Sequence, residues 1–412
     1  MKELKLFLSQ PHNTRILLIT SLIYAFVLPV VDIFVAAYIM RNSSEAGRVV
    51  LYQLMVYSGI PITFWLNGFL LKWIKPNYLY SFGMLLSGFS MLIMISLPEL
   101  HIQGIAVAGL VMGMSFGFFW SNRDYLVIVS TTDENRNYYY GVETFFNTLT
   151  FVVVPVIVGL FISNAINYSW IGNINKAYEF VIYVVMFLAI IASLIICRGD
   201  YEKPASSKFV YLRFEPVWYK MLLVAWGKGL VQGFIVTAPA MLIMKLVGEE
   251  GELGIVQSIS SLVTALMMYV IGRNLKPNRR LVVYFVAVWL FFIGALTNSL
   301  VFNCYSVLFF LLCMIVARPL FDMAYFPIQM QVIDYLSEKE DRSEYSYIFN
   351  HECGLYIGRV FGCGSFIVLA FCVSDNAALM VTLPIVTLLQ AITYWMVKNI
   401  LKKIENEVDK TT

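Results

Sequence analysis

The feature that most constrains this chain is a series of long apolar runs that recurs from the N-terminus to the C-terminus. About 20 mostly apolar residues cross the hydrocarbon core of a bilayer as an α-helix, which pairs every backbone N–H and C=O within the segment. The runs are too long for barrel strands and lack their alternation. We therefore predict an all-α integral membrane protein. The predicted spans are 14–40, 48–72, 78–97, 102–128, 140–163, 177–197, 217–246, 250–271, 280–300, 304–335, 344–371 and 376–400.

Composition supports a membrane environment, because only 13% of the 412 residues are charged and 59% are hydrophobic. A soluble domain carries about twice that charged fraction. Lys and Arg concentrate on alternate loops, and the other loops hold few of them: Arg41, Arg48, Lys176 and Lys245. Because short basic loops stay in the cytoplasm, we predict that both termini and the loop 198–216 are cytoplasmic, in the cytoplasmic (inner) membrane.

Two sequence echoes suggest that the chain is a duplication. Lys75–Asn77 after the second span matches Lys276–Asn278 after the eighth. The acidic-then-Arg cluster Asp133–Arg136 after the fourth span matches Glu340–Arg342 after the tenth. Inverted or parallel repeats of this kind are common in transporters. We predict three parts: an N-terminal six-helix bundle over 1–197, a cytoplasmic loop over 198–216 and a C-terminal six-helix bundle over 217–412.

Six plus six helices with cytoplasmic termini and a basic central loop resemble the major facilitator superfamily. That family carries a Gly-x-x-x-Asp-x-x-Gly-Arg-Arg/Lys signature after spans two and eight. Here the second copy keeps its glycine and closing basic pair, whereas Lys72 stands in the first copy where the family has an acid. We expect gating at the cytoplasmic helix ends by Asp124, Arg136, Gly272, Arg273, Arg279 and Arg280.

Ionisable side chains inside the apolar runs are the candidates for function, because charge facing lipid is costly. Lys228 and Gln232, like Arg318 and Asp322, are spaced four residues apart and so share a helix face. The resemblance implies that spans one, four, seven and ten line a central cavity. The predicted solute-binding residues are Tyr24, Trp120, Arg123, Lys228, Gln232, Arg318, Asp322, Tyr356 and Arg359. The predicted proton-coupling residues are Asp32, Glu143 and Glu352.

A structural role competes with each of these interpretations. Buried cations and anions are nearly balanced, so many of them can form ion pairs that only fix the packing. Lys228 has no acid within one helical turn, so its partner comes from another helix or from the solute. His351 is expected to be a satisfied buried histidine, since no metal-ligand spacing surrounds it.

These features favour a secondary active transporter that works by alternating access and proton-coupled symport. Its predicted solute is a small polar organic molecule, which can be an anion. The alternative is a proton-driven multidrug or metabolite efflux pump. It is less supported, because the cavity holds several cations and only part of an antiporter signature surrounds Pro155.

Other classes of function find little support. No Walker loop, His-Glu-x-x-His or nucleophile elbow points to an enzyme. A solute sensor normally needs a signalling domain, for which the tail 402–412 is short. We expect no cofactor, no metal and no nucleic-acid partner. The expected partners are the solute, a coupling proton and the lipid bilayer, and we expect a monomer.

Overall fold

A computed structural model describes residues 2–97, 99–131, 133–167, 171–202, 211, 213–275, 277–342 and 344–408. Eleven helices in these ranges are long and apolar enough to cross a membrane. The remaining predicted span, the first one over 14–40, is helical but interrupted. The predicted class, an all-α multi-pass membrane protein, is confirmed.

The chain forms two compact units. The first comprises Met1–Ser206 and Gly248–Ser261, and the second comprises Ser207–Val247 and Leu262–Thr412. The predicted domain boundaries stay a prediction.

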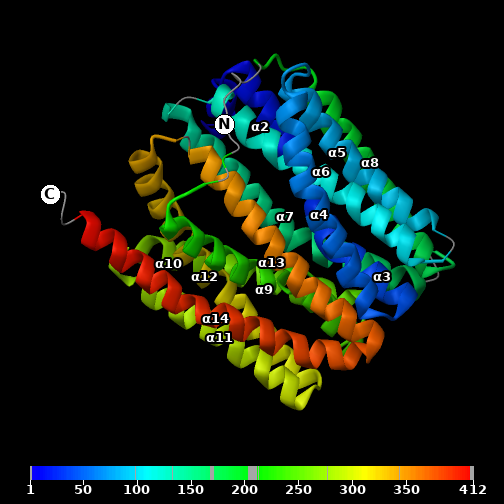
Figure 1. The fold of residues 1–412 in the computed structure, drawn as a ribbon. Helices are drawn as coiled ribbons and strands as arrows, with labels where there is room; N and C mark the ends of the chain where they lie inside the picture. Colours follow the sequence, from blue (N-terminus) through cyan, green and yellow to red (C-terminus); the bar gives the residue numbers. More distant parts are fainter. Residues whose placement is uncertain are drawn as a thin grey trace. The chain divides into compact units, whose positions relative to one another are not determined.

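The first half of the chain supplies most helices of the first unit (Figure 1). Their bounds are α1 Lys2–Leu8, α2 His12–Tyr24, the π-helix η1 Val30–Phe34, α3 Val35–Ser43, α4 Ala46–Leu70, α5 Pro76–Ser96, α6 Ile102–Ser130, α7 Asp133–Asn167 and α8 Ile174–Ile196.

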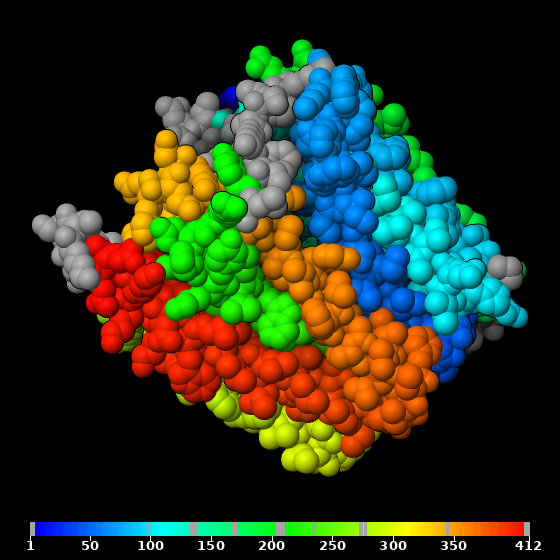
Figure 2. Space-filling model, in the orientation of Figure 1, coloured from blue at the N-terminus to red at the C-terminus, as the bar shows by residue number. Residues whose placement is uncertain are grey.

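The later helices are α9 Pro216–Leu246, α10 Glu250–Asn274, the 3-10 turn η2 Pro277–Arg279, α11 Arg280–Val301, α12 Cys304–Glu340, α13 Glu344–Cys372 and α14 Asp375–Val408. In the second unit α11 and α14 lie side by side (Figure 1). Figure 2 shows the side chains of α14, in red, as a continuous band beside those of α11.

The first predicted span is broken where its proline lies. Pro29 lacks an N–H and its ring crowds the preceding turn, which disfavours a regular helix just before it, although other helices of this chain, such as α4 at Pro61, continue through a proline. The α-helix ends at Tyr24, and five residues from Val30 to Phe34 form a π-helical turn before α3 begins. Asp32, the predicted coupling residue, lies in this π-helix, a type of turn that often occurs at functional sites.

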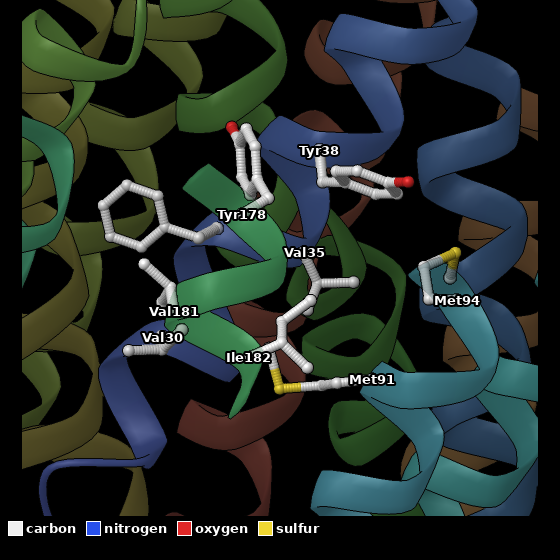
Figure 3. Close-up of a pocket in the computed structure, with 9 residues that line it drawn as sticks. Val30, Val35, Tyr38, Met91, Met94, Tyr178, Val181 and Ile182 are labelled. Carbon is white, nitrogen blue, oxygen red and sulfur yellow. The ribbon is translucent and has the colours of Figure 1, made fainter. Parts of the chain in front are cut away.

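Apolar side chains hold this interrupted helix in place. Figure 3 shows Val30, Val35 and Tyr38 facing Met91 of α5 and Ile182 of α8 around a small apolar pocket. The π-helix and α3 thus line the same apolar pocket as two regular helices, α5 and α8.

Glycine pairs allow some helices to approach each other at backbone distance. Gly113 of α6 lies against Val56 and Gly59 of α4, where a Cβ atom would collide with the backbone. In the second unit Gly358 of α13 contacts Gly229 of α9 in the same way. Small residues are the usual means by which membrane helices pack closely. The second contact matters for the site, because it sets the spacing between α9 and α13.

Candidate functional site

A polar cavity of ≈ 250 Å³ lies within the second unit. It is formed by α9, α11, α12 and α14. Its polar lining consists of Lys228, Gln232, Arg318, Asp322 and Gln390. Its apolar lining consists of Val236, Ala287, Phe291, Ala317, Phe321 and Phe326. One end of a bound molecule can therefore meet charges and amides while another part contacts rings and methyl groups.

Lys228 lies at the centre of the polar lining and is 8% exposed. Its Nζ is 3.4 Å from a carboxylate oxygen of Asp322 on α12. The ammonium also lies 3.8 Å from the ring centroid of Phe326 and 4.2 Å from that of Tyr325. Both the carboxylate and the aromatic rings stabilise a desolvated cation. The sequence predicted that the partner of Lys228 comes from another helix or from the solute, and in the structure Asp322 of α12 is that partner.

Arg318 differs from Lys228 in having no ion pair with any residue that the structure describes. It is exposed and lines the cavity one helical turn from Asp322. The same-helix pair of Arg318 with Asp322, which the spacing suggested, is replaced by the pair between Asp322 and Lys228. The guanidinium of Arg318 remains available to an anion in the cavity.

Arg359 of α13 ties two helices together beside the cavity. Its Nε and Nη2 donate to the side-chain oxygen of Gln232 at 3.0 and 2.8 Å. Its Nη1 lies 3.6 Å from Glu352 on the same helix. Arg359 is 5% exposed and is not among the residues that line the cavity. It therefore acts on the site through Gln232, whose side chain it holds in position.

His351 is buried and accepts or donates a hydrogen bond with the hydroxyl of Tyr325 at 2.5 Å. This satisfied histidine supports one of the rings around Lys228. Sequence reasoning missed Phe321, Tyr325, Phe326 and Gln390 as site residues. The first three share a helix with Arg318 and Asp322, and that aromatic cluster was the available signal.

A second charged cluster lies in the first unit. Arg123 of α6 donates to both carboxylate oxygens of Glu143 on α7, with Nε at 3.2 Å. Its guanidinium lies 5.3 Å from the ring centroid of Tyr140 and pairs with Asp124 at 2.7 Å. The Tyr139 hydroxyl donates to Glu143 at 3.2 Å. The structure therefore joins the predicted binding residue Arg123 to the predicted coupling residue Glu143.

The predicted aromatic site residues have different surroundings. Tyr24 is fully buried, donates to Ser87 at 2.9 Å and packs on Phe119. Trp120 is 40% exposed, and Tyr356 is half-buried on α13. Tyr24 thus fastens α2 to α5 and α6.

The predicted gating residues are only partly described. Arg279 is exposed, Arg280 is half-buried, and Asp124 is an exposed partner of Arg123. Arg136, Gly272 and Arg273 lie outside the residues whose side chains the structure describes.

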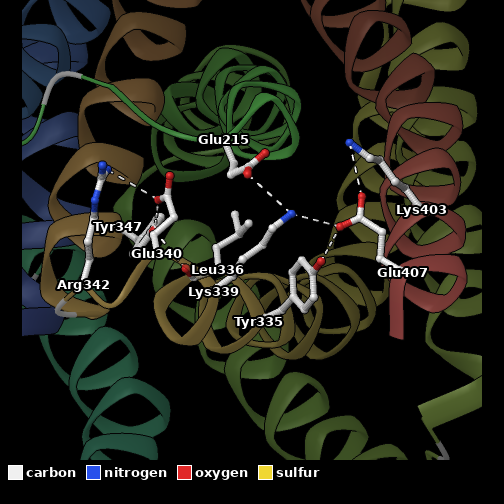
Figure 4. Close-up of polar contacts among 9 residues, drawn as sticks. All are labelled: Glu215, Tyr335, Leu336, Lys339, Glu340, Arg342, Tyr347, Lys403 and Glu407. Carbon is white, nitrogen blue, oxygen red and sulfur yellow. Dashed lines mark hydrogen bonds and ion pairs between the residues drawn. The ribbon is translucent and has the colours of Figure 1, made fainter. Parts of the chain in front are cut away.

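A further charge network joins helix ends in the second unit (Figure 4). Lys339 of α12 contacts Glu215 at 3.4 Å and Glu407 of α14 at 3.0 Å, and Lys403 contacts Glu407 at 3.5 Å. Nearby, Arg342 pairs with Glu340 at 3.4 Å. These charges are mostly solvent-accessible, so each pair contributes little stability alone. The network connects the start of α9 with the ends of α12 and α14.

Within the described ranges, no three His, Cys, Asp or Glu side chains are grouped so that they could hold a metal ion.

The family model of the Major Facilitator Superfamily matches residues 16–363. The Uncharacterized protein YqgE of Bacillus subtilis (strain 168) is 22% identical over 382 residues, which are 92% of this chain and 87% of that protein. The Uncharacterized protein in sodM 3'region of Geobacillus stearothermophilus is 28% identical over 179 residues, or 42% of this chain and 76% of that protein.

Solved structures show the same fold. The crystal structure of the nucleoside transporter NupG superposes with a TM-score of 0.70 at 11% identity, covering 95% of this chain and all of that one (100%). A bacterial homolog of the human lysosomal transporter Spinster, in an inward-facing and unoccupied conformation, superposes with a TM-score of 0.63 at 14% identity. It covers 96% of this chain and 99% of that chain.

Proposed function

The chain belongs to the Major Facilitator Superfamily, and we propose that it carries a small organic anion across the cytoplasmic membrane by alternating access. The observation that carries this proposal is Arg318, an exposed guanidinium in the polar cavity without an ion-pair partner among the described residues. Guanidinium groups bind carboxylates and phosphates through two parallel hydrogen bonds. A solute with such a group would supply the missing negative charge.

The apolar lining suggests what else the solute carries. Phe291, Phe321 and Phe326 face the same cavity as Arg318, and Gln390 adds an amide. Ligand sites typically combine apolar walls with a few polar groups that fix orientation. We propose a carboxylate or phosphate attached to a ring or another compact apolar group. The nucleoside transporter NupG shares the fold at 11% identity and adds no evidence about which ring.

Efflux of lipophilic cations is the alternative. Arg318, which forms no ion pair with the described residues, disfavours it, because its guanidinium would repel a cation in the cavity. Stabilisation of the protein by lipophilic cations, and not by acids, would favour this alternative.

The experiment is a thermal-shift screen of the purified protein against matched pairs, such as aromatic acids and their neutral amides. A ligand that binds the folded state raises the melting temperature by mass action. We expect the acids to raise it and the amides to leave it unchanged.

Arg318→Gln is expected to weaken binding of the stabilising acid about 30-fold or more, because a charge-assisted hydrogen bond is lost. Arg198→Gln is the control, since it removes an exposed arginine that does not line the cavity. Full acid binding by Arg318→Gln, or an equal loss in both variants, would contradict the proposed anion site.

Proton coupling is proposed to use the observed ion pair. An anion bound near Lys228 competes with Asp322 for the ammonium, and a proton taken up by the released carboxylate would remove the repulsion between the two negative charges. Proton uptake and anion binding then favour each other, which is the requirement for symport. Asp322 thus joins Asp32, Glu143 and Glu352 as a candidate for the coupling residue.

Two substitutions separate these candidates. We expect Asp322→Asn to keep acid binding but to lose its dependence on pH, and Asp32→Asn to retain both. The measurement is the affinity for the stabilising acid at several pH values. If Asp32→Asn alone abolishes the pH dependence, the coupling proton belongs to the π-helix of the first unit, as the sequence suggested.

A further inference from the structure

The start of α10 belongs to the first unit although the sequence places this helix in the second half of the chain. Residues 248–261 group with the first unit, and residues 262–274 of the same helix group with the second. The contacts that hold the first turns of α10 therefore act on a helix whose later turns belong to the second unit.

A buried carboxylate provides that attachment. Glu250, the first residue of α10, is 0% exposed. Arg41 at the end of α3 binds it with two bonds, Nε to Oε1 at 2.9 Å and Nη2 to Oε2 at 2.5 Å. Tyr178 of α8 donates its hydroxyl to Oε1 at 2.9 Å. Glu249 contacts Arg41 at 3.3 Å but is itself largely exposed.

Close backbone packing accompanies the ion pair. Gly159 of α7 lies so near α10 that a Cβ atom would come within 2.5 Å of the carbonyl oxygen of Glu250. A Cβ atom at Gly251 would lie 3.5 Å from that of Ser163. Beyond these turns α10 exposes large apolar side chains, among them Ile259, Leu262 and Leu266. The contact with the first unit is thus concentrated at one end of the helix.

The chemistry of the contact between Arg41 and Glu250 allows it to break and re-form. A buried ion pair contributes little net stability compared with apolar packing, because removing both charges from water is costly. The side chain of Arg41 remains 27% exposed, so water can reach the pair when it separates. Such a contact can open without unfolding the helices on either side.

We propose that Arg41, Tyr178 and Glu250 form a latch that is closed in this structure and that opens during transport. By the predicted topology these residues lie at outer ends of their spans, so the latch closes the outer side. This inference concerns gating and rests on alternating access, but it does not depend on the identity of the solute. It also needs no anion bound at Arg318.

The test measures maleimide labelling of Gly251→Cys in purified detergent-solubilised protein. A thiol at this position lies inside the closed latch and should react slowly. Adding Glu250→Gln removes the charge that Arg41 binds, and we expect the labelling rate to rise about tenfold or more, since breaking one side of a buried pair is strongly unfavourable. Tyr178→Phe removes only one hydrogen bond and should give a smaller increase.

Three controls make the result decisive. Glu249→Gln removes the exposed neighbouring carboxylate and should leave the rate unchanged. The native Cys313 and Cys363, both buried in the second unit, should stay unlabelled in every variant. In Ser163→Cys/Gly251→Cys the 3.5 Å spacing suits a disulfide, which should abolish labelling at position 251 until a reductant is added, while the exposed Cys372 stays reactive.

The proposal is overturned if Glu250→Gln leaves the rate unchanged or if Glu249→Gln raises it equally. It is also overturned if labelling of Cys363 rises in parallel, because the contact would then serve only to hold the folded structure. Failure of acids to bind in the thermal-shift screen would contradict the proposed anion site and leave the latch measurement intact.

Discussion

Lys228→Ala is expected to reduce binding of the stabilising acid about 100-fold or more and to lower the melting temperature. The substitution removes the ammonium from between Asp322 and the rings of Tyr325 and Phe326. Asp322 then stays in the cavity as an uncompensated negative charge, which repels an anionic solute. Truncating one partner of a buried, hydrogen-bonded charge pair typically costs about 2–5 kcal/mol. The measurements are a thermal-unfolding curve and an acid titration.

Two variants distinguish repulsion from lost contact. Lys228→Met keeps most of the side-chain length and should still bind poorly, because the charge is missing. Lys228→Met/Asp322→Leu removes both charges and should recover most of the melting temperature, since an apolar pair of similar volume often replaces an ion pair without loss. Normal acid binding by Lys228→Met would show that the ammonium serves only the packing of α9 against α12.

The membrane class of this protein follows from the sequence because each apolar run carries its own evidence. A run such as 177–197 is long and apolar enough to span by itself, and the structure has α8 over Ile174–Ile196. The break in the first span was less predictable. Pro29 indicates a kink, but a proline in a sequence does not specify the π-helical turn that the structure has over Val30–Phe34.

The candidate site was predicted as a set of charges but not as a set of pairs. Helical spacing identifies neighbours on one helix, so it suggested an ion pair between Arg318 and Asp322. The observed partner of Asp322 is Lys228, which is 94 residues away in the sequence. Such a pairing depends on how α9 packs against α12, and one sequence alone does not contain that information.

Glu250 shows a different reason for an incomplete prediction. It begins a predicted span next to Glu249 and near Glu252, where acidic residues usually face water. The structure buries Glu250 and leaves Glu249 largely exposed. Among the described residues, Arg41 binds Glu250 through two hydrogen bonds but meets Glu249 in a single contact at 3.3 Å, and the hydroxyl of Tyr178 donates to Glu250. Arg41 and Tyr178 lie on helices more than 70 positions earlier in the sequence.

Arg123→Ala is expected to lower the free energy of unfolding by about 3 kcal/mol, the lower part of the range for breaking a buried ion pair. Glu143 is 5% exposed and would keep only the hydroxyl of Tyr139 as a described hydrogen-bond donor. The ring of Tyr140 would also lose its cation. The measurement is the shift in thermal unfolding of the purified protein, for which several degrees are expected.

The exposed neighbour of this pair gives the matched control. Asp124→Asn alters a carboxylate whose side chain is 64% exposed, so its effect should be within about 0.5 kcal/mol. Arg123→Met/Glu143→Leu should be more stable than Arg123→Ala, because no unpaired charge remains. Equal destabilisation by Asp124→Asn would contradict a dominant Arg123–Glu143 pair. If the double variant is stable and binds the acid but no longer accumulates it, Glu143 serves the transport cycle as well as the packing of α6 on α7.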